Sequence, residues 1–160
     1  MVLVELNKVV EVVRSRSRGY RAERELVHIL WRLGFAVMRA PASGARMRKA
    51  EYPDVVAIMK GKVAVFEVKS RAKLSGLYVE SEQIKKLLDF AERAGGIPYI
   101  AVKIPHREWR FIKVMKRIDE ESKTYKVSKE DIEKAPGIGG VLADLGLMKT
   151  LSEYLKESSS

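Results

Sequence analysis

Cysteine is absent from this chain of 160 residues, which excludes disulfides, thiolate metal sites and cysteine nucleophiles. Long hydrophobic runs are absent too, because the apolar runs at 55–59 and 63–66 are far too short to span a bilayer. Asparagine and glutamine occur once each, as Asn7 and Gln83, and a scarcity of these heat-labile residues fits growth at high temperature. The chain is nevertheless 46% hydrophobic, which is enough for a packed core.

Acidic residues are also relatively few. The chain has 21 Asp and Glu residues and 31 Lys and Arg residues, which gives a net charge of +10. The excess is uneven: residues 1–50 hold 11 basic and 4 acidic side chains, and the remainder hold 20 and 17. Concentrated positive charge favours a polyanion partner, most simply a nucleic acid. A thermophile surface predicts many charges of both signs, not a surplus of one. The sequence therefore fits a nucleic-acid-binding protein that also has the highly charged surface of a thermophile.

The length indicates one domain of ordinary size, preceded by a short extension. Residues 1–13 place apolar side chains on one helical stripe, although their β-branched content also allows a strand. Residues 14–19 are polar and basic and end in glycine, which is typical of a mobile arm or linker. We therefore expect an N-terminal extension and basic arm at 1–18, with a partner helix or a dimer as candidate contacts, and a single domain at 19–160.

The order of the expected elements predicts an α/β fold with a mixed central β-sheet flanked by helices. Apolar periodicity and glycine stops predict two helices and two short helical segments, at 20–33, at 80–94 and within 128–155. Apolar or alternating runs predict five strands, at 35–39, 54–59, 62–69, 97–104 and 109–115. A tight turn at 60–61 joins the second strand to the third, and a basic loop at 40–52 precedes them.

The hairpin carries the chemistry, with Asp54 at its start and Glu67 and Lys69 at its end. Strand side chains alternate between faces, so Glu67 and Lys69 point the same way, beside apolar neighbours. Burying these charges is costly unless they are paired or hold a metal. Two carboxylates brought together suit Mg²⁺, and a nearby lysine can orient the attacking water or offset charge on a phosphate. A purely structural ion pair is the alternative.

A third carboxylate, Glu23, lies on the apolar stripe of the first expected helix, three, four and seven residues before Leu26, Val27 and Leu30. Packing of that helix on the sheet could bring Glu23 to the two acids of the hairpin. Glu25 falls on the other side of the helix. The alternative for Glu23 is a role at the helix N-terminus, where acids are favourable.

A hairpin with Pro-Asp on one strand and Glu-x-Lys on the next resembles the PD-(D/E)xK nuclease superfamily, whose core is restriction-endonuclease-like. The resemblance becomes specific when four motifs are read in order: GxxxER from Gly19 to Arg24, RAPASG at 39–44, PD at 53–54 and EVKSR at 67–71. Together they look like the archaeal Holliday junction resolvases of the Hjc and Hje type. The similarity covers roughly residues 18 to 115 well, and the C-terminal tail more loosely.

That resemblance implies a homodimeric endonuclease that nicks opposing strands of a four-way DNA junction in recombination and repair, with Mg²⁺ or Mn²⁺ as cofactor. It implies these catalytic residues: Glu23, Ser43, Asp54, Glu67 and Lys69. The implied metal ligands are Glu23, Asp54, Glu67 and Val68. The implied DNA-binding residues are Arg18, Arg21, Arg24, Arg39, Ser43, Arg46, Arg48, Lys49 and Arg71. No membrane or small-molecule partner is expected, and the location is expected to be cytoplasmic, at the nucleoid.

Two other functions remain open at this point. A nuclease of the same superfamily that acts on flaps, mismatches or duplex DNA would share the site but lack the RAPASG loop. A non-catalytic junction-binding module would keep the fold, but all four charged positions are present here, at Glu23, Asp54, Glu67 and Lys69. Separately, the glycine-rich segment 136–140 fits either a helix-hairpin-helix phosphate clamp or a plain turn between helices.

Overall fold

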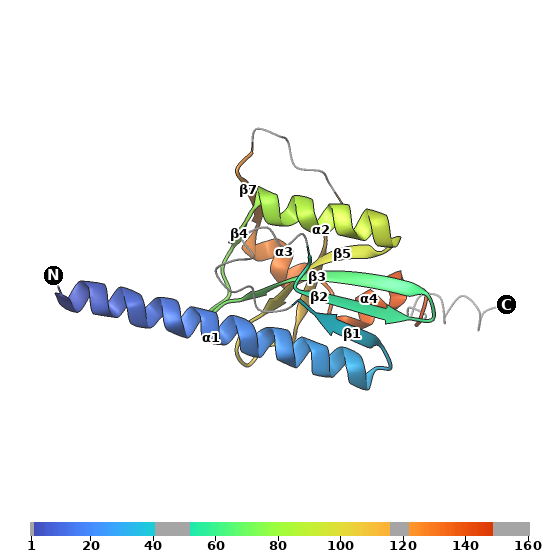
Figure 1. The fold of residues 1–160 in the computed structure, drawn as a ribbon, viewed down its shortest axis with the longest axis horizontal. Coiled ribbons are helices and arrows are strands. Elements are labelled where there is room, and N and C mark those ends of the chain that lie inside the picture. The colour runs from blue at the N-terminus through green and yellow to red at the C-terminus, as the bar shows by residue number, and fades with distance from the viewer. Residues whose placement is uncertain (1, 41–51, 116–121, 149–160) are drawn as a thin grey trace.

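The computed structural model describes residues 2–40, 52–115 and 122–148. Its centre is a five-stranded sheet in the order β1-β2-β3-β5-β6, in which β3 and β5 run parallel and the other neighbours antiparallel. The strands are β1 (Ala36–Arg39), β2 (Val55–Met59), β3 (Lys62–Ser70), β5 (Ile97–Lys103) and β6 (Arg110–Lys113). The predicted α/β class, with a mixed sheet flanked by helices, is confirmed (Figure 1).

Strands β2 and β3 form the predicted hairpin. Their turn is made by Lys60 and Gly61, which both have positive φ angles, of 50° and 75°. Two consecutive left-handed residues match the right-handed twist of the flanking strands and allow a two-residue connection. The resulting register sets Val55 opposite Phe66, so the residue before β2 lies beside the last third of β3.

Helices cover both faces of the sheet (Figure 1). On one face, α1 (Val2–Arg32) and α4 (Ile138–Asp144) bury apolar residues against one side of the strands. On the other face, α2 (Ser81–Ala94) packs through Ile84, Leu87 and Ala91, and it ends at Gly95 in a left-handed conformation. Alternate residues of β2 and β3 enter the two cores, as strand geometry requires.

The expected linker at 14–19 is wrong in its secondary structure, because α1 runs without a break from Val2 to Arg32. Helix formation is cooperative, and one glycine inside a helix costs only about 1 kcal/mol, so the packed half of α1 extends through Gly19. Residues 4–18 are exposed and project from the body (Figure 1). The boundary at residue 18 therefore marks where packing begins, and as a domain boundary it stays a prediction.

A second, two-stranded sheet was missed by the sequence reasoning. It pairs β4 (Leu77–Glu80) with β7 (Thr124–Val127), and α3 (Lys129–Lys134) follows it. The two short helical segments expected in the tail correspond to α3 and α4. In the described parts of the chain, no helix combines the length and the apolar character needed to cross a membrane.

Candidate active site

Asp54 and β3 meet at one end of the hairpin. The Oδ2 atom of Asp54 accepts a hydrogen bond of 2.8 Å from the backbone N–H of Val68. This contact follows from the register, because Asp54 directly precedes the Val55–Phe66 pair. It fixes the carboxylate of Asp54 beside the backbone between Glu67 and Lys69, as the hairpin predicted.

Lys69 is held between two oxygen atoms. Its Nζ atom lies 2.9 Å from Oε1 of Glu67 and donates a hydrogen bond of 3.1 Å to Oε1 of Gln83 in the first turn of α2. Glu67 is only 6% exposed and is the one buried charged residue among those described. The prediction that Glu67 and Lys69 point the same way is therefore confirmed, and α2 supplies a partner that nothing in the hairpin motif indicates.

The pKa values of the buried acids are raised, which indicates that the positive charge beside them does not fully compensate their negative charge. The pKa of Glu67 is raised from 4.5 to about 7, first by burial and then by the neighbouring Asp54 and Glu23, while Lys69 lowers it. Burial also raises the pKa of Asp54, against the Val68 hydrogen bond and Lys69. Perturbed acids of this kind concentrate at functional sites, because a cation or a proton must compensate their charge.

Glu23 approaches the same point from α1, which covers the opposite face of the sheet. Its pKa is raised by burial first and by Asp54 second, while Arg39 lowers it. Glu23 and Arg39 form a long ion pair, with 3.8 Å between Arg39 NH1 and Glu23 Oε2. Glu23 is thus near enough to feel both hairpin acids, and Arg39 lies on the strand next to them, paired with Val55.

The donor set fits a hard divalent cation. Among the described residues, no three His, Cys, Asp or Glu side chains converge closely enough to enclose a metal ion by themselves. Mg²⁺ does not need such an enclosure, because it keeps several waters and takes one or two protein carboxylates. Asp54 and Glu67 provide the two carboxylates, and the Val68 carbonyl and Glu23 remain predicted ligands.

The predicted DNA-binding residues divide into two groups. Ser43, Arg46, Arg48 and Lys49 lie outside the described residues. Of the others, Arg18, Arg21, Arg24 and Arg39 are exposed, and Arg71 is half-buried, with NH1 donating to the carbonyl of Ser70. The exposed arginines of α1 flank the position of Glu23 in the sequence of the same helix but lie about 100° or more around it from Glu23.

Two interactions escaped the sequence reasoning. Gln83 is the only glutamine of the chain and lies one turn before the buried Leu87, and that placement was the one available signal for it. Glu25 was assigned only to the side of the helix away from Glu23. Its Oε1 atom accepts a 3.0 Å hydrogen bond from Trp109 Nε1 and lies 2.9 Å from Lys103 Nζ. This cluster ties α1 to β5 and to the segment before β6.

Comparison with known proteins identifies the lineage of this site. The sequence model of the archaeal Holliday junction resolvase family, Hjc, matches residues 14–144. The chain belongs to the archaeal Hjc family. It is 36% identical over 143 residues to the crossover junction endodeoxyribonuclease Hjc of Sulfurisphaera tokodaii, a match that spans 88% of this chain and 98% of that protein.

A second Hjc relative, the crossover junction endodeoxyribonuclease of Archaeoglobus fulgidus, is 35% identical over 112 residues, which cover 70% of this chain and 79% of that one. The crystal structure of Archaeoglobus fulgidus Hjc, described as a Holliday junction resolvase from an archaeal hyperthermophile, superposes with a TM-score of 0.61 at 30% identity. It covers 74% of this chain and 97% of its own. The Hjc match contains Glu23, Asp54, Glu67 and Lys69, and it leaves the first 13 residues outside.

Proposed function

We propose that this chain is a structure-specific endonuclease that resolves four-way DNA junctions by hydrolysing phosphodiester bonds, in recombination and repair at the nucleoid. The observation that carries the proposal is the cluster of Asp54, Glu67 and Lys69 at the end of the hairpin, in a chain of the Hjc family. The surplus of basic residues, most of it in the first third of the chain, suits a DNA partner.

The proposed cofactor is Mg²⁺, for which Mn²⁺ can substitute. Asp54, Glu67 and the Val68 carbonyl would hold it, with Glu23 close by. When bound, such a cation supplies a Lewis acid that polarises the phosphate and lowers the pKa of water. The raised pKa values of the acids support this assignment, because a cation among them relieves both their burial and their mutual repulsion.

The chain's own residues would position the reacting groups. Lys69 projects its ammonium group from the site, and Glu67 and Gln83 hold that group in one place. A fixed ammonium offsets the charge that builds up on the phosphate during hydrolysis. Gln83 is therefore a positioning residue for Lys69. Ser43 is assigned to the same site by the resemblance of its loop, and Arg39 next to Glu23 would contact the backbone of the DNA.

A homodimer is part of the proposal, because a four-way junction has near two-fold symmetry and resolution requires two cuts. One surface of the described chain suits a second copy. On the side of the sheet that α2 covers, β1 and β2 extend beyond the helix and leave Met38 at 63% and Ile58 at 39% exposure. An uncovered apolar strip on a sheet is typical of a protein interface.

The test is cleavage of an end-labelled, immobile four-way junction and of a linear duplex of the same sequence, with Mg²⁺ or with EDTA. We expect paired, symmetric nicks in the junction alone, and only with the metal. Asp54→Asn should slow cleavage by roughly a hundredfold to a thousandfold while the junction still binds. Asp89→Asn, which removes an exposed acid from α2, should cut like the parent chain.

Each other outcome contradicts a specific part of the proposal. Equal cutting of junction and duplex would reduce the function to a general nuclease, and unpaired nicks would contradict the dimer. Tight junction binding without cleavage in Mg²⁺ or Mn²⁺ would exclude the enzyme and leave a binding module. Full activity of Asp54→Asn would remove the site itself.

A further inference from the structure

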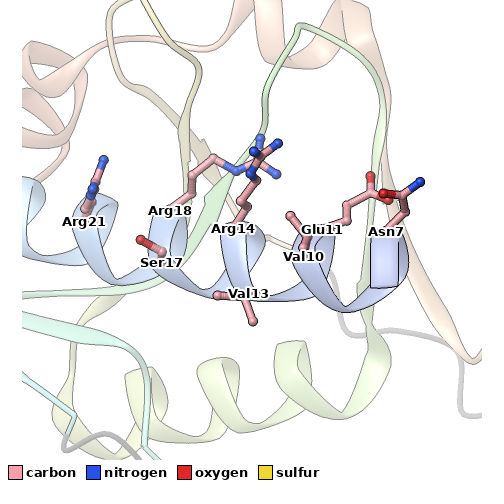
Figure 2. Close-up of a pocket in the computed structure, with 8 residues that line it drawn as sticks. All are labelled: Asn7, Val10, Glu11, Val13, Arg14, Ser17, Arg18 and Arg21. Atoms are coloured by element: carbon pink, nitrogen blue, oxygen red, sulfur yellow. The ribbon is translucent and has the colours of Figure 1, made fainter. Parts of the chain in front are cut away.

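The projecting half of α1 and the turn that follows it carry a row of arginines that none of the active-site interactions use. Arg14, Arg18 and Arg21 follow one another at helical spacings of four and three residues, so they share one side of the helix. Figure 2 shows their side chains extending to that same side. A groove of about 650 Å³ lies along this stretch, and every residue that lines it falls between Asn7 and Arg21.

The three arginines are free to bind an anion. Within the described residues, none of them lies within ion-pair distance of a carboxylate, although Glu11 lines the same groove. The cations around the site and the sheet behave differently, since Arg39, Lys69, Lys103 and Lys113 all have acidic partners. Like charges repeated along one side of a helix destabilise it unless something negative lies against them.

The spacing of the row suggests what that anion is. Glu23 follows Arg21 by two residues on the same helix, and at about 100° per residue it lies about 180° around the axis from Arg14, so the row and Glu23 occupy opposite sides of α1. From Arg14 to Arg21 the rise is about 10 Å, or roughly three phosphate steps of one strand of duplex DNA. The row therefore matches the spacing of successive phosphates on one strand, on the side of α1 that faces away from Glu23.

We propose that Arg14, Arg18 and Arg21 form a phosphate track that holds the sugar–phosphate backbone of one junction arm along α1, on the side away from Glu23. The inference rests on the proposed function and extends it, because it names a junction arm as the ligand of the projecting helix. Contacts of this kind position the DNA without reading its sequence. Arg14 and the groove belong to no part of the active site as described above.

The projecting helix itself gains from such a ligand. Valines at 9, 10, 12 and 13 are poor helix formers, and the half of α1 that contains them has no packed face. Neutralising the arginine row removes the repulsion along that side of the helix. Binding of the DNA arm and helix formation at 4–18 should therefore reinforce each other.

The experiment compares two double variants that each remove two positive charges from the same helix. Arg14→Gln with Arg18→Gln disrupts the track. Lys8→Gln with Arg16→Gln is the matched control, because Arg16 lies about 200° around the helix from Arg14 and neither control residue lines the groove. Junction binding is measured between 50 and 300 mM NaCl in EDTA, and backbone protection is mapped by hydroxyl-radical footprinting.

We expect the track variant to reduce the slope of log affinity against log salt concentration by about two, and to lose backbone protection over a few consecutive phosphates of a junction arm. The control should keep the protection, with a change in slope well below one. Circular dichroism and thermal unfolding of all variants show that the fold is intact. Equal slopes and equal footprints for the two double variants would overturn the track.

Failure of the track is distinct from failure of the proposed function. If the parent chain cuts the junction and the track variant keeps its salt slope and footprint, only the track is wrong. If the parent chain neither cuts nor prefers the junction but the track variant still loses protection on a plain duplex, the arginine row binds DNA and the junction-resolving function is wrong.

Discussion

The two halves of α1 have the same apolar periodicity, but the apolar side chains of one half are buried and those of the other half are exposed to solvent. In the packed half, Ala22, Leu26 and Leu30 are 3%, 0% and 0% exposed. In the projecting half, Leu6 and Val9 are 58% and 59% exposed. The comparison teaches that a helical stripe predicts a helix without predicting what covers it. The packed half brings Glu23 to the acids of the hairpin, and the projecting half can contribute only through a partner.

The largest expected difference between the halves concerns catalysis. Glu23→Gln removes the acid that the packed half supplies, and we expect the rate of junction cleavage under saturating enzyme to fall by roughly a hundredfold to a thousandfold. Glu5→Gln makes the same chemical change in the projecting half and should leave that rate unchanged. Single-turnover kinetics measure both. Equal rates for the two variants would show that Glu23 serves the helix and not the chemistry.

The next difference concerns stability. Leu30→Ala leaves a cavity in the core and should lower the free energy of unfolding by about 3 kcal/mol, within a range of about 2–5. Val9→Ala removes an exposed side chain and replaces a β-branched residue by the best helix former, so it should change stability by less than about 0.5 kcal/mol. Denaturant unfolding in EDTA gives both values. A large loss for Val9→Ala would mean that the projecting half is packed in solution, for example against a second copy.

The smallest effect is a dependence of stability on pH. It tests the ionisation of Glu67 in the site that the packed half of α1 adjoins. The pKa of Glu67 is raised from 4.5 to about 7, chiefly by burial. A raised folded pKa contributes stability that is fully present below pH 4.5 and lost as the pH rises through 7. In EDTA the parent chain should therefore lose roughly 2 kcal/mol over that interval, and Glu67→Gln should lose much less.

Added Mg²⁺ provides the control for the pH dependence, since a cation needs the ionised carboxylate and should offset the loss above pH 7. Parallel stability curves for the parent chain and Glu67→Gln, with and without Mg²⁺, would mean that Glu67 ionises freely in the folded chain.

The hairpin was predictable because its determinants are local. Alternation along 62–69 and a two-residue turn at 60–61 suffice to place Asp54, Glu67 and Lys69 together, and the structure has them so. The fold class was predictable for the same reason, since helices and strands alternate in a recognisable order. The position of Glu23 near these acids was predictable from its place on the apolar stripe of α1.

What escaped prediction depends on contacts between distant segments. Gln83 reaches Lys69 only because α2 crosses over the sheet to connect the parallel strands β3 and β5. The pairing of β4 with β7 joins segments that α2, β5 and β6 separate, and each strand has only four residues. The helical state of residues 14–19 depends on cooperativity with the packed half of α1, which a window of six polar residues does not reveal.

The turn at Lys60 and Gly61 lies at the far end of the hairpin from Asp54. Its length nevertheless sets the register that places Asp54 beside Glu67. Side chains on a strand change face with every residue, so one residue inserted or deleted there would move Glu67 and Lys69 to the side of α1 if β2 kept its place. The same shift would move Phe66 and Val68 out of the core that α1 covers, so the core and the acid cluster would be lost together. Length, as well as sequence, is therefore under constraint in a turn that lies at the opposite end of the hairpin from the acids.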